Sequence, residues 1–263
     1  MKKLLLGIIF LLVLFSGSAI VLAEEIIIVG TGSGMALLQT VADEYMKAGA
    51  DIKITVPDSI GSSGGIKAVG TDQYRIGRVG RELRKTESHY SLSYVPFAKL
   101  PIIFFTNKSV TVENISPQQA CDIYSGKITN WQEVGGNDAK IRVVRREDGD
   151  SSLQVLQDSL PGFKEITITP KSKTALTDQE TLEFVESVKD TIAFGTYGNA
   201  KTYNVNVLSI EGKNPENDDY PYTGSLALIF KEKNRKGDLL KFIEYVRSPA
   251  ASDAIRKAGG LPF

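Results

Sequence analysis

Three clusters of glycine and hydroxyl side chains stand where short apolar segments give way to helical patterns. They are Gly30-Thr31-Gly32-Ser33-Gly34 after residues 26–29, Gly61-Ser62-Ser63-Gly64-Gly65 after residues 52–56, and Gly149-Asp150-Ser151-Ser152 shortly after residues 141–145. Helix N-termini expose unpaired N–H groups and a partial positive charge, glycine allows close backbone approach, and hydroxyls add rotatable donors. Three such turns in one chain therefore indicate a site for a small anion.

Two arginines could hold that anion, because a guanidinium stays charged and presents two parallel N–H groups to an oxyanion. Arg146 directly follows the third strand pattern. Arg81 could instead form a surface ion pair with Glu82 or Glu87, and the sequence leaves both roles open. Isolated serines in these turns would be read as helix caps. Their recurrence at three strand–helix turns favours ligand binding.

Other chemistries fit the same residues less well. Residues 61–65 match G-x-S-x-G, the nucleophile turn of serine hydrolases, but His89 is the only histidine and follows too closely in a polar stretch. A dinucleotide fingerprint fails at Met35, where close packing needs a third glycine. Glu147 and Asp148 could be paired carboxylates for acid–base work or a hard metal, but beside a glycine they are more typical of a solvated loop. We expect no catalytic residues.

The first 23 residues have the pattern of a secretory signal. Lys2 and Lys3 precede an apolar run over residues 4–15, and Val21-Leu22-Ala23 suits cleavage before Glu24. An uncleaved membrane anchor is the alternative, since apolar residues continue to Leu22. No cysteine stands at the cleavage position, so we expect a periplasmic protein that is not a lipoprotein.

Charge and cysteine content argue against several classes of function. Without Lys2 and Lys3, 29 basic residues face 31 acidic ones, a formal charge of −2, which does not favour nucleic acid or a membrane surface. The single cysteine, Cys121, lies in an apolar pattern and is expected in the core. With one cysteine and one histidine, we expect no metal site and no cofactor.

Strand and helix patterns alternate from Glu25 to about Gly70, which indicates an α/β fold with a mainly parallel sheet. The spacing predicts helices over residues 35–47 and 64–69 and a buried strand over residues 100–106 at the end of the first structural unit. A further helix is predicted over residues 177–187, with Thr177 as its cap and Glu180 completing a capping box.

Several segments resemble the phosphate-type solute-binding proteins of ABC transporters. The similarity rests on Gly61 to Lys67 at the second turn, on Ile76-Gly77 followed by Arg81-Glu82-Leu83, on Ile123 to Trp131 ("IYSGKITNW") followed by Gly135-Gly136, on Tyr220-Pro221, and on the C-terminal Gly259-Gly260-Leu261-Pro262-Phe263. Nearly the whole chain after residue 23 is covered.

That resemblance implies a two-lobed periplasmic-binding-protein fold of type II, with mixed, mainly parallel sheets, helices on both faces and a double crossover hinge. The expected segments are 1–23 (signal peptide), 24–107 (lobe 1), 108–217 (lobe 2) and 218–263 (return to lobe 1). It implies a monomer that captures a tetrahedral oxyanion, phosphate first of all, between the lobes and delivers it to an ABC permease of the inner membrane. The alternative is an exported sensor or adaptor of the same fold that reports an anion or another ligand to a membrane partner.

The resemblance also assigns ligand positions, with two departures. Together with the residues above, the expected ligand set is Ser33, Gly34, Met35, Ser62, Ser63, Arg81, Arg146, Asp150, Ser151 and Ser152. Gly80 stands where family members often have a carboxylate or serine, and Asp150 stands in the third turn. Asp150 is therefore expected either to accept the proton of a protonated oxyanion or only to cap the following helix.

Overall fold

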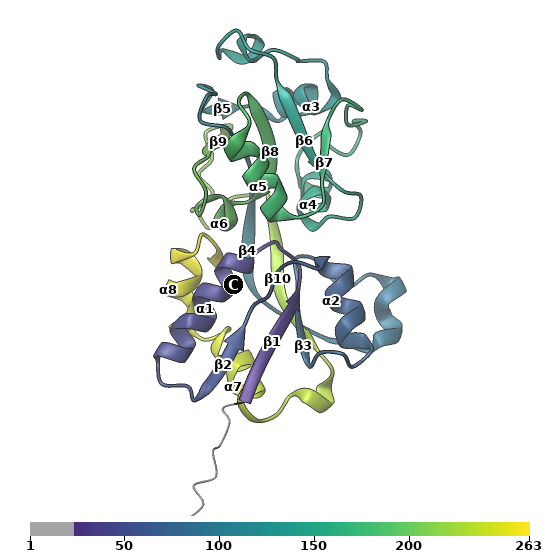
Figure 1. Ribbon diagram of the computed structural model, residues 1–263, viewed down its shortest axis with the longest axis vertical. Coiled ribbons are helices and arrows are strands. Elements are labelled where there is room, and N and C mark those ends of the chain that lie inside the picture. Colours follow the sequence, from purple (N-terminus) through teal and green to yellow (C-terminus); the bar gives the residue numbers. More distant parts are fainter. Residues whose placement is uncertain (1–23) are drawn as a thin grey trace, which may run out of the picture.

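The computed structural model describes residues 24–263, so the predicted signal peptide lies outside the described residues. Figure 1 shows a lower and an upper body connected through the long strands β4 and β10. The lower body holds β1 (Glu24–Gly30), α1 (Met35–Lys47), β2 (Ile52–Thr55), α2 (Gly61–Gly70), β3 (Ile76–Val79), β10 (Thr223–Phe230), α7 (Gly237–Tyr245), α8 (Pro249–Lys257) and β11 (Leu261–Pro262). The upper body holds β5 (Asn114–Ile115), α3 (Pro117–Ser125), β6 (Arg142–Arg146), α4 (Ser151–Ser159), β7 (Lys173–Ala175), α5 (Asp178–Ser187), β8 (Thr191–Thr196), α6 (Tyr197–Ala200) and β9 (Asn206–Ile210). β4 (Ser93–Thr106) enters both, and three 3₁₀ turns cover Lys85–Tyr90, Trp131–Val134 and Glu232–Asn234.

Each body has its own hydrophobic core. In the lower body, alternate residues of β10 point to opposite faces of the sheet: Leu226 and Leu228 pack with α1, α7 and α8, and Ala227 and Ile229 pack with α2. The upper core is rich in aromatic rings, and its largest fully buried side chain, Trp131, lies in one of the segments that resemble the family. Cys121 lies in this core, as predicted.

The sheet is mixed, with strand order β2-β1-β3-β10-β4-β8-β6-β7. Among the described residues, five strand pairs are parallel and five antiparallel. The expectation of a mainly parallel sheet is wrong in this respect. The α/β class is confirmed, and every antiparallel pair involves β4, which enters both bodies, or its neighbour β10.

The predicted helix over residues 35–47 is confirmed as α1, but other bounds differ. β4 begins at Ser93, seven residues before the predicted strand. Pro96 is accommodated there because the register with β10 shifts between Leu226 and Ala227, and a bulge needs no regular ladder bond. The helix predicted from Gly64 begins at Gly61, so the second glycine/serine cluster forms the first turn of α2. Thr177 caps α5 as predicted, but Glu180 accepts from the Leu176 N–H (2.8 Å) and forms no capping box with Thr177.

The chain passes between the bodies at two adjacent points. Ile102 to Phe105 pack in the upper core, whereas Leu100 packs in the lower one. On the return, Tyr220 and Tyr222 still belong to the upper core, and the Ile102 N–H donates to the Tyr222 carbonyl (2.8 Å). The change of core thus falls at Pro101 and Tyr222, whereas the predicted boundaries were at 107 and 217. Between residues 24 and 263, none of the helices has the length and apolar character needed to span a bilayer.

Candidate anion-binding site

Serine hydroxyls from the two bodies meet where the bodies face each other. Ser33, in the turn between β1 and α1, lies 3.0 Å from the Ser151 hydroxyl and 3.4 Å from that of Ser152, at the start of α4. All three side chains are buried. The structure therefore brings together the first and third turns, which are more than a hundred residues apart in the sequence.

The second turn reaches the same place through Gly80. The Gly80 N–H donates to the Ser62 hydroxyl (3.2 Å), and a Cβ added at Gly80 would lie 2.8 Å from Ser151 Oγ. Ser62 is the second residue of α2 and Ser151 the first of α4, so their N–H groups have no carbonyl of a preceding turn to bind. The N-terminal ends of α1, α2 and α4 thus meet at one serine cluster, formed by Ser33, Ser62, Ser151 and Ser152.

Backbone geometry explains why glycine opens the first turn. Gly30 has φ +140°, and a Cβ there would lie 1.9 Å from the Arg78 carbonyl oxygen. Gly34, the residue before α1, has φ +72° and packs against Leu226 and Leu100. Both are left-handed or close-packed positions that favour glycine. Gly34 therefore shapes the turn and faces the lower core.

Arg146 is the last residue of β6. It lies beside the serine cluster and is surrounded by acidic groups. Its guanidinium lies 3.1 Å from an oxygen of Asp178 and 3.2 Å from one of Asp150, and its Nε lies 3.1 Å from Glu147. The side chains of Arg146, Asp150 and Asp178 are each 4–5 % exposed. One buried cation therefore faces two buried carboxylates, a local excess of negative charge.

This arrangement shifts two pKa values. Burial alone would lower the pKa of Arg146, but Asp178, Asp150 and Glu147 together raise it above its ordinary value. Burial raises the pKa of Asp150 to about 7, against the opposing effect of Arg146. Arg146 is thus permanently charged, and Asp150 is poised to hold or release a proton near neutral pH.

Asp150 has two contacts that match the two roles expected of it. One carboxylate oxygen accepts from the Leu153 N–H (2.9 Å) and caps α4, and the other lies toward Arg146. The capping role is therefore confirmed. Acceptance of a ligand proton remains a prediction, now with a second buried carboxylate, that of Asp178, beside it.

Ser63 and Arg81 form a separate group with Glu87. The Arg81 guanidinium donates to both oxygens of Glu87 (2.7 and 2.9 Å) and to the Ser63 hydroxyl (3.1 Å). The ion pair that the sequence offered as the alternative role of Arg81 is therefore present, with Glu87 as the partner. His89, on the same 3₁₀ turn, is exposed and bonds to the Thr86 carbonyl.

Other contacts connect the bodies beside the serine cluster. The Asn199 side-chain amide, on α6, donates to the Gly32 carbonyl (3.0 Å). Gln179, on α5, approaches the Met35 sulfur (3.4 Å), so Met35 contacts the upper body. A Cβ added at Gly32 would lie 2.5 Å from an Asp178 oxygen, which places Asp178 directly across from the first turn.

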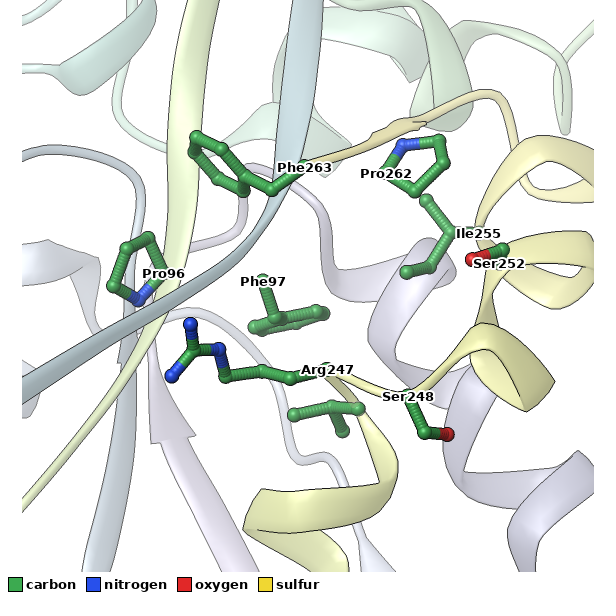
Figure 2. Close-up of a pocket in the computed structure, with 9 residues that line it drawn as sticks. Pro96, Phe97, Arg247, Ser248, Ser252, Ile255, Pro262 and Phe263 are labelled. Atoms are coloured by element: carbon green, nitrogen blue, oxygen red, sulfur yellow. The ribbon is translucent and has the colours of Figure 1, made fainter.

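Two cavities flank the serine cluster. One, of about 260 Å³, is lined by both turns of the lower body and by Arg146, Asp150, Ser151 and Asp178 of the upper body. The other, of about 250 Å³, shares Ser151 and is lined by Gly80 and Arg81. A smaller pocket of about 90 Å³ lies between β4, the α7–α8 turn and the C-terminal residues (Figure 2), and no residue of the serine cluster lines it.

Sequence reasoning missed Asp178, Asn199 and Arg78. Asp178 reads in the sequence as an ordinary acidic residue in the first turn of a helix, and only its proximity to Arg146 gives it a role. Asn199 lies on a four-residue helix with no glycine/serine signal. Arg78 lies in a strand between apolar residues, where a charged side chain could have been noticed as unusual.

Comparison with known proteins identifies the family of this chain. The family model for the PBP superfamily domain matches residues 19–250. The chain belongs to the PBP superfamily. The phosphate-binding protein PstS of Borreliella burgdorferi is 26% identical over 260 residues, covering 90% of each chain. The phosphate-binding protein PstS of Bacillus subtilis is 25% identical over 228 residues, covering 83% of this chain and 74% of that protein.

Two solved structures have a similar fold. A Clostridium perfringens protein, described as a phosphate ABC transporter substrate-binding protein and solved with bound phosphate, superposes with a TM-score of 0.80 at 28% identity. That comparison covers 91% of this chain and all of the other. A phosphate transport receptor of Vibrio cholerae, at 22% identity and a TM-score of 0.62 over 90% of this chain and 99% of the other, supports the fold alone.

Proposed function

We propose that this member of the PBP superfamily is the phosphate-binding protein of an ABC transporter. The observation that carries the proposal is the serine cluster with Arg146 beside it, buried where the two bodies meet. Three helix N-termini and the hydroxyls supply donors for an oxyanion, and Arg146 supplies a charge. The likeness to a structure that holds phosphate supports the same ligand.

Phosphate suits this site because the site contains acceptors as well as donors. A protonated phosphate donates a hydrogen bond to a carboxylate, whereas a fully deprotonated oxyanion such as sulfate is repelled by it. Asp150 and Asp178 both lie within 3.2 Å of Arg146, so either can accept that proton. We infer that these carboxylates replace the acceptor that Gly80 cannot provide.

The two bodies act as the lobes of a type II binding fold in this proposal. The contacts of Ser33 with Ser151 and of Asn199 with Gly32 join them around the site. The paired crossings at Pro101 and Tyr222 supply a double hinge, and closure around the anion reports occupancy to a permease. No bond is made or broken in the ligand, so the protein is not an enzyme.

The proposal includes export. From the signal pattern of residues 1–23 we infer that the protein is exported to the periplasm, with cleavage before Glu24 and without a lipid anchor. N-terminal sequencing of the protein from periplasmic extract tests this. Recovery only in the membrane fraction with Met1 intact would contradict it.

Equilibrium dialysis of the purified protein against labelled phosphate tests the binding function. We expect one phosphate per chain, released unchanged when the protein is unfolded. A protein that retains no phosphate, arsenate or sulfate would contradict the proposal, and a chemically altered ligand would contradict the non-enzymatic role.

A further inference from the structure

Arg78 is a fully buried arginine outside the serine cluster. It lies on β3, its exposed fraction is 0%, and it is among the largest fully buried side chains of the described residues. Its guanidinium donates to three backbone carbonyls: that of Thr31 (2.7 Å), that of Pro57 (2.7 Å) and that of Ile28. Among residues 24–263, no carboxylate lies within ion-pairing distance of it.

The three carbonyls belong to segments that lead into the serine cluster. Ile28 is in β1, Thr31 is in the first turn, and Pro57 precedes the second turn. The Thr31 hydroxyl in turn accepts from the Ser33 N–H (3.2 Å). The planar fork of Arg78 thus holds together the backbone that presents Ser33 and Ser62.

Carbonyls alone do not explain a buried charge. An unpaired guanidinium is costly to bury, and neutral carbonyls supply no opposite charge. Burial lowers the pKa of Arg78 to about 10, so it stays charged at neutral pH, and the charges of Asp178 and Asp58 oppose that fall. The surrounding structure therefore stabilises the charged form through negative groups that do not touch it.

Asp178 lies opposite Arg78 across the first turn. Arg78 binds the Thr31 carbonyl from the core of the lower body, while the Asp178 carboxylate lies against Gly32 from the upper body. The Thr31–Gly32 turn thus separates the two charges. On its other side, Asp178 forms an ion pair with Arg146. Arg146 is also paired with Asp150 and with Glu147.

We propose that Arg78 is the second cation of the anion site: its charge compensates Asp178 across the first turn when the two bodies are together, so that an anion can bind beside two buried carboxylates. Arg78 is a positioning and charge-compensating residue, and it does not contact the ligand. The consequence for ligand affinity rests on the proposed function, whereas the coupling between Arg78 and Asp178 does not.

A double-mutant cycle in thermal unfolding tests the coupling without any ligand. The variants are Arg78→Gln, which keeps amide donors but loses the charge, Asp178→Asn, and their combination. We expect the double variant to unfold at least about 2 °C above the temperature that the two single changes predict together. A double variant that shows only additive losses, or that does not fold although both single variants do, overturns the proposal. If Arg78→Gln alone does not fold, recovery of folding in the double variant supports it, and failure of both overturns it.

Phosphate titration adds a readout that a purely structural role would not produce. Arg78→Lys keeps the charge but not the fork, and Arg78→Gln keeps donors but not the charge. We expect Arg78→Gln to bind phosphate about tenfold more weakly than Arg78→Lys, and equal affinities of these two variants overturn the charge role. A parent protein that binds no oxyanion would refute the proposed function, while the unfolding cycle would still decide whether Arg78 and Asp178 are coupled.

Discussion

Replacement of Arg146 by alanine should separate its role in the fold from its role in binding. The parent guanidinium is 4% exposed and is the ion-pair partner of Asp150 and Asp178. Its removal leaves two buried carboxylates without a counterion, which costs about 3–5 kcal/mol of folding free energy. A second change, Asp178→Asn, should recover part of that loss, because it removes one of the uncompensated charges.

Binding should respond differently from stability. Loss of two charge-assisted hydrogen bonds to phosphate, at about 1.5–3 kcal/mol each, weakens affinity by roughly a hundredfold or more. The double variant Arg146→Ala/Asp178→Asn should regain stability but not this affinity, since no guanidinium faces the ligand. Urea unfolding and calorimetric titration of the same samples measure the two quantities.

Arg145 offers a matched control on the same strand. Its partner Asp148 is 94% exposed, and an exposed ion pair contributes only about 0–1 kcal/mol. We expect Arg145→Ala to unfold and bind phosphate almost like the parent. A folded Arg146→Ala protein that binds phosphate as tightly as the parent would refute the role given to Arg146.

Three further predictions concern neighbouring groups. Burial raises the pKa of Asp150 to about 7 from an unfolded value near 4, so the parent protein loses stability as pH rises through this range and Asp150 ionises. Asp150→Asn can still cap α4 but does not ionise, so it should lack that loss when its unfolding is compared at pH 5 and pH 8. Gly80→Ala should fold but bind phosphate at least about tenfold more weakly in calorimetry, because its Cβ would lie 2.8 Å from Ser151 Oγ and 3.3 Å from the Ser33 Cβ; unchanged affinity would show that the ligand lies elsewhere. Arg81 lowers the pKa of Glu87, so Glu87→Gln should destabilise the protein at pH 7 and lose this effect as pH falls below about 4, and an effect that persists in acid would contradict the ion pair as its cause.

The sequence predicted the local elements better than the contacts between them. The first helix, the Thr177 cap and the three glycine/serine turns follow from local rules of periodicity and capping, and the structure contains them. The first seven residues of β4 were missed; they include Pro96, which the structure accommodates beside a shift of register with β10. That same strand carries the chain from the lower core into the upper one between Leu100 and Ile102, within the strand and not at its end.

The candidate site was predicted only in part, for a physical reason. Hydroxyls and glycines at strand–helix turns leave a signal in the sequence, and Ser33, Ser62, Ser151 and Ser152 do meet. The ion-pair partners of a charged residue leave no such signal in the sequence, because an ion pair depends on distances between residues far apart in the chain. Asp178 lies 32 residues after Arg146 and could be assigned to it only from the structure.

Competition calorimetry with phosphate and sulfate tests the central claim most directly. The protein should bind one phosphate per chain and bind sulfate much more weakly at the same pH and ionic strength, because only phosphate keeps a proton for Asp150 or Asp178. Asp150→Asn or Asp178→Asn should reduce that preference, with the larger change identifying the acceptor. Equal affinity for the two anions in the parent, or no heat with either, would contradict a phosphate site built from the serine cluster, Arg146 and these carboxylates.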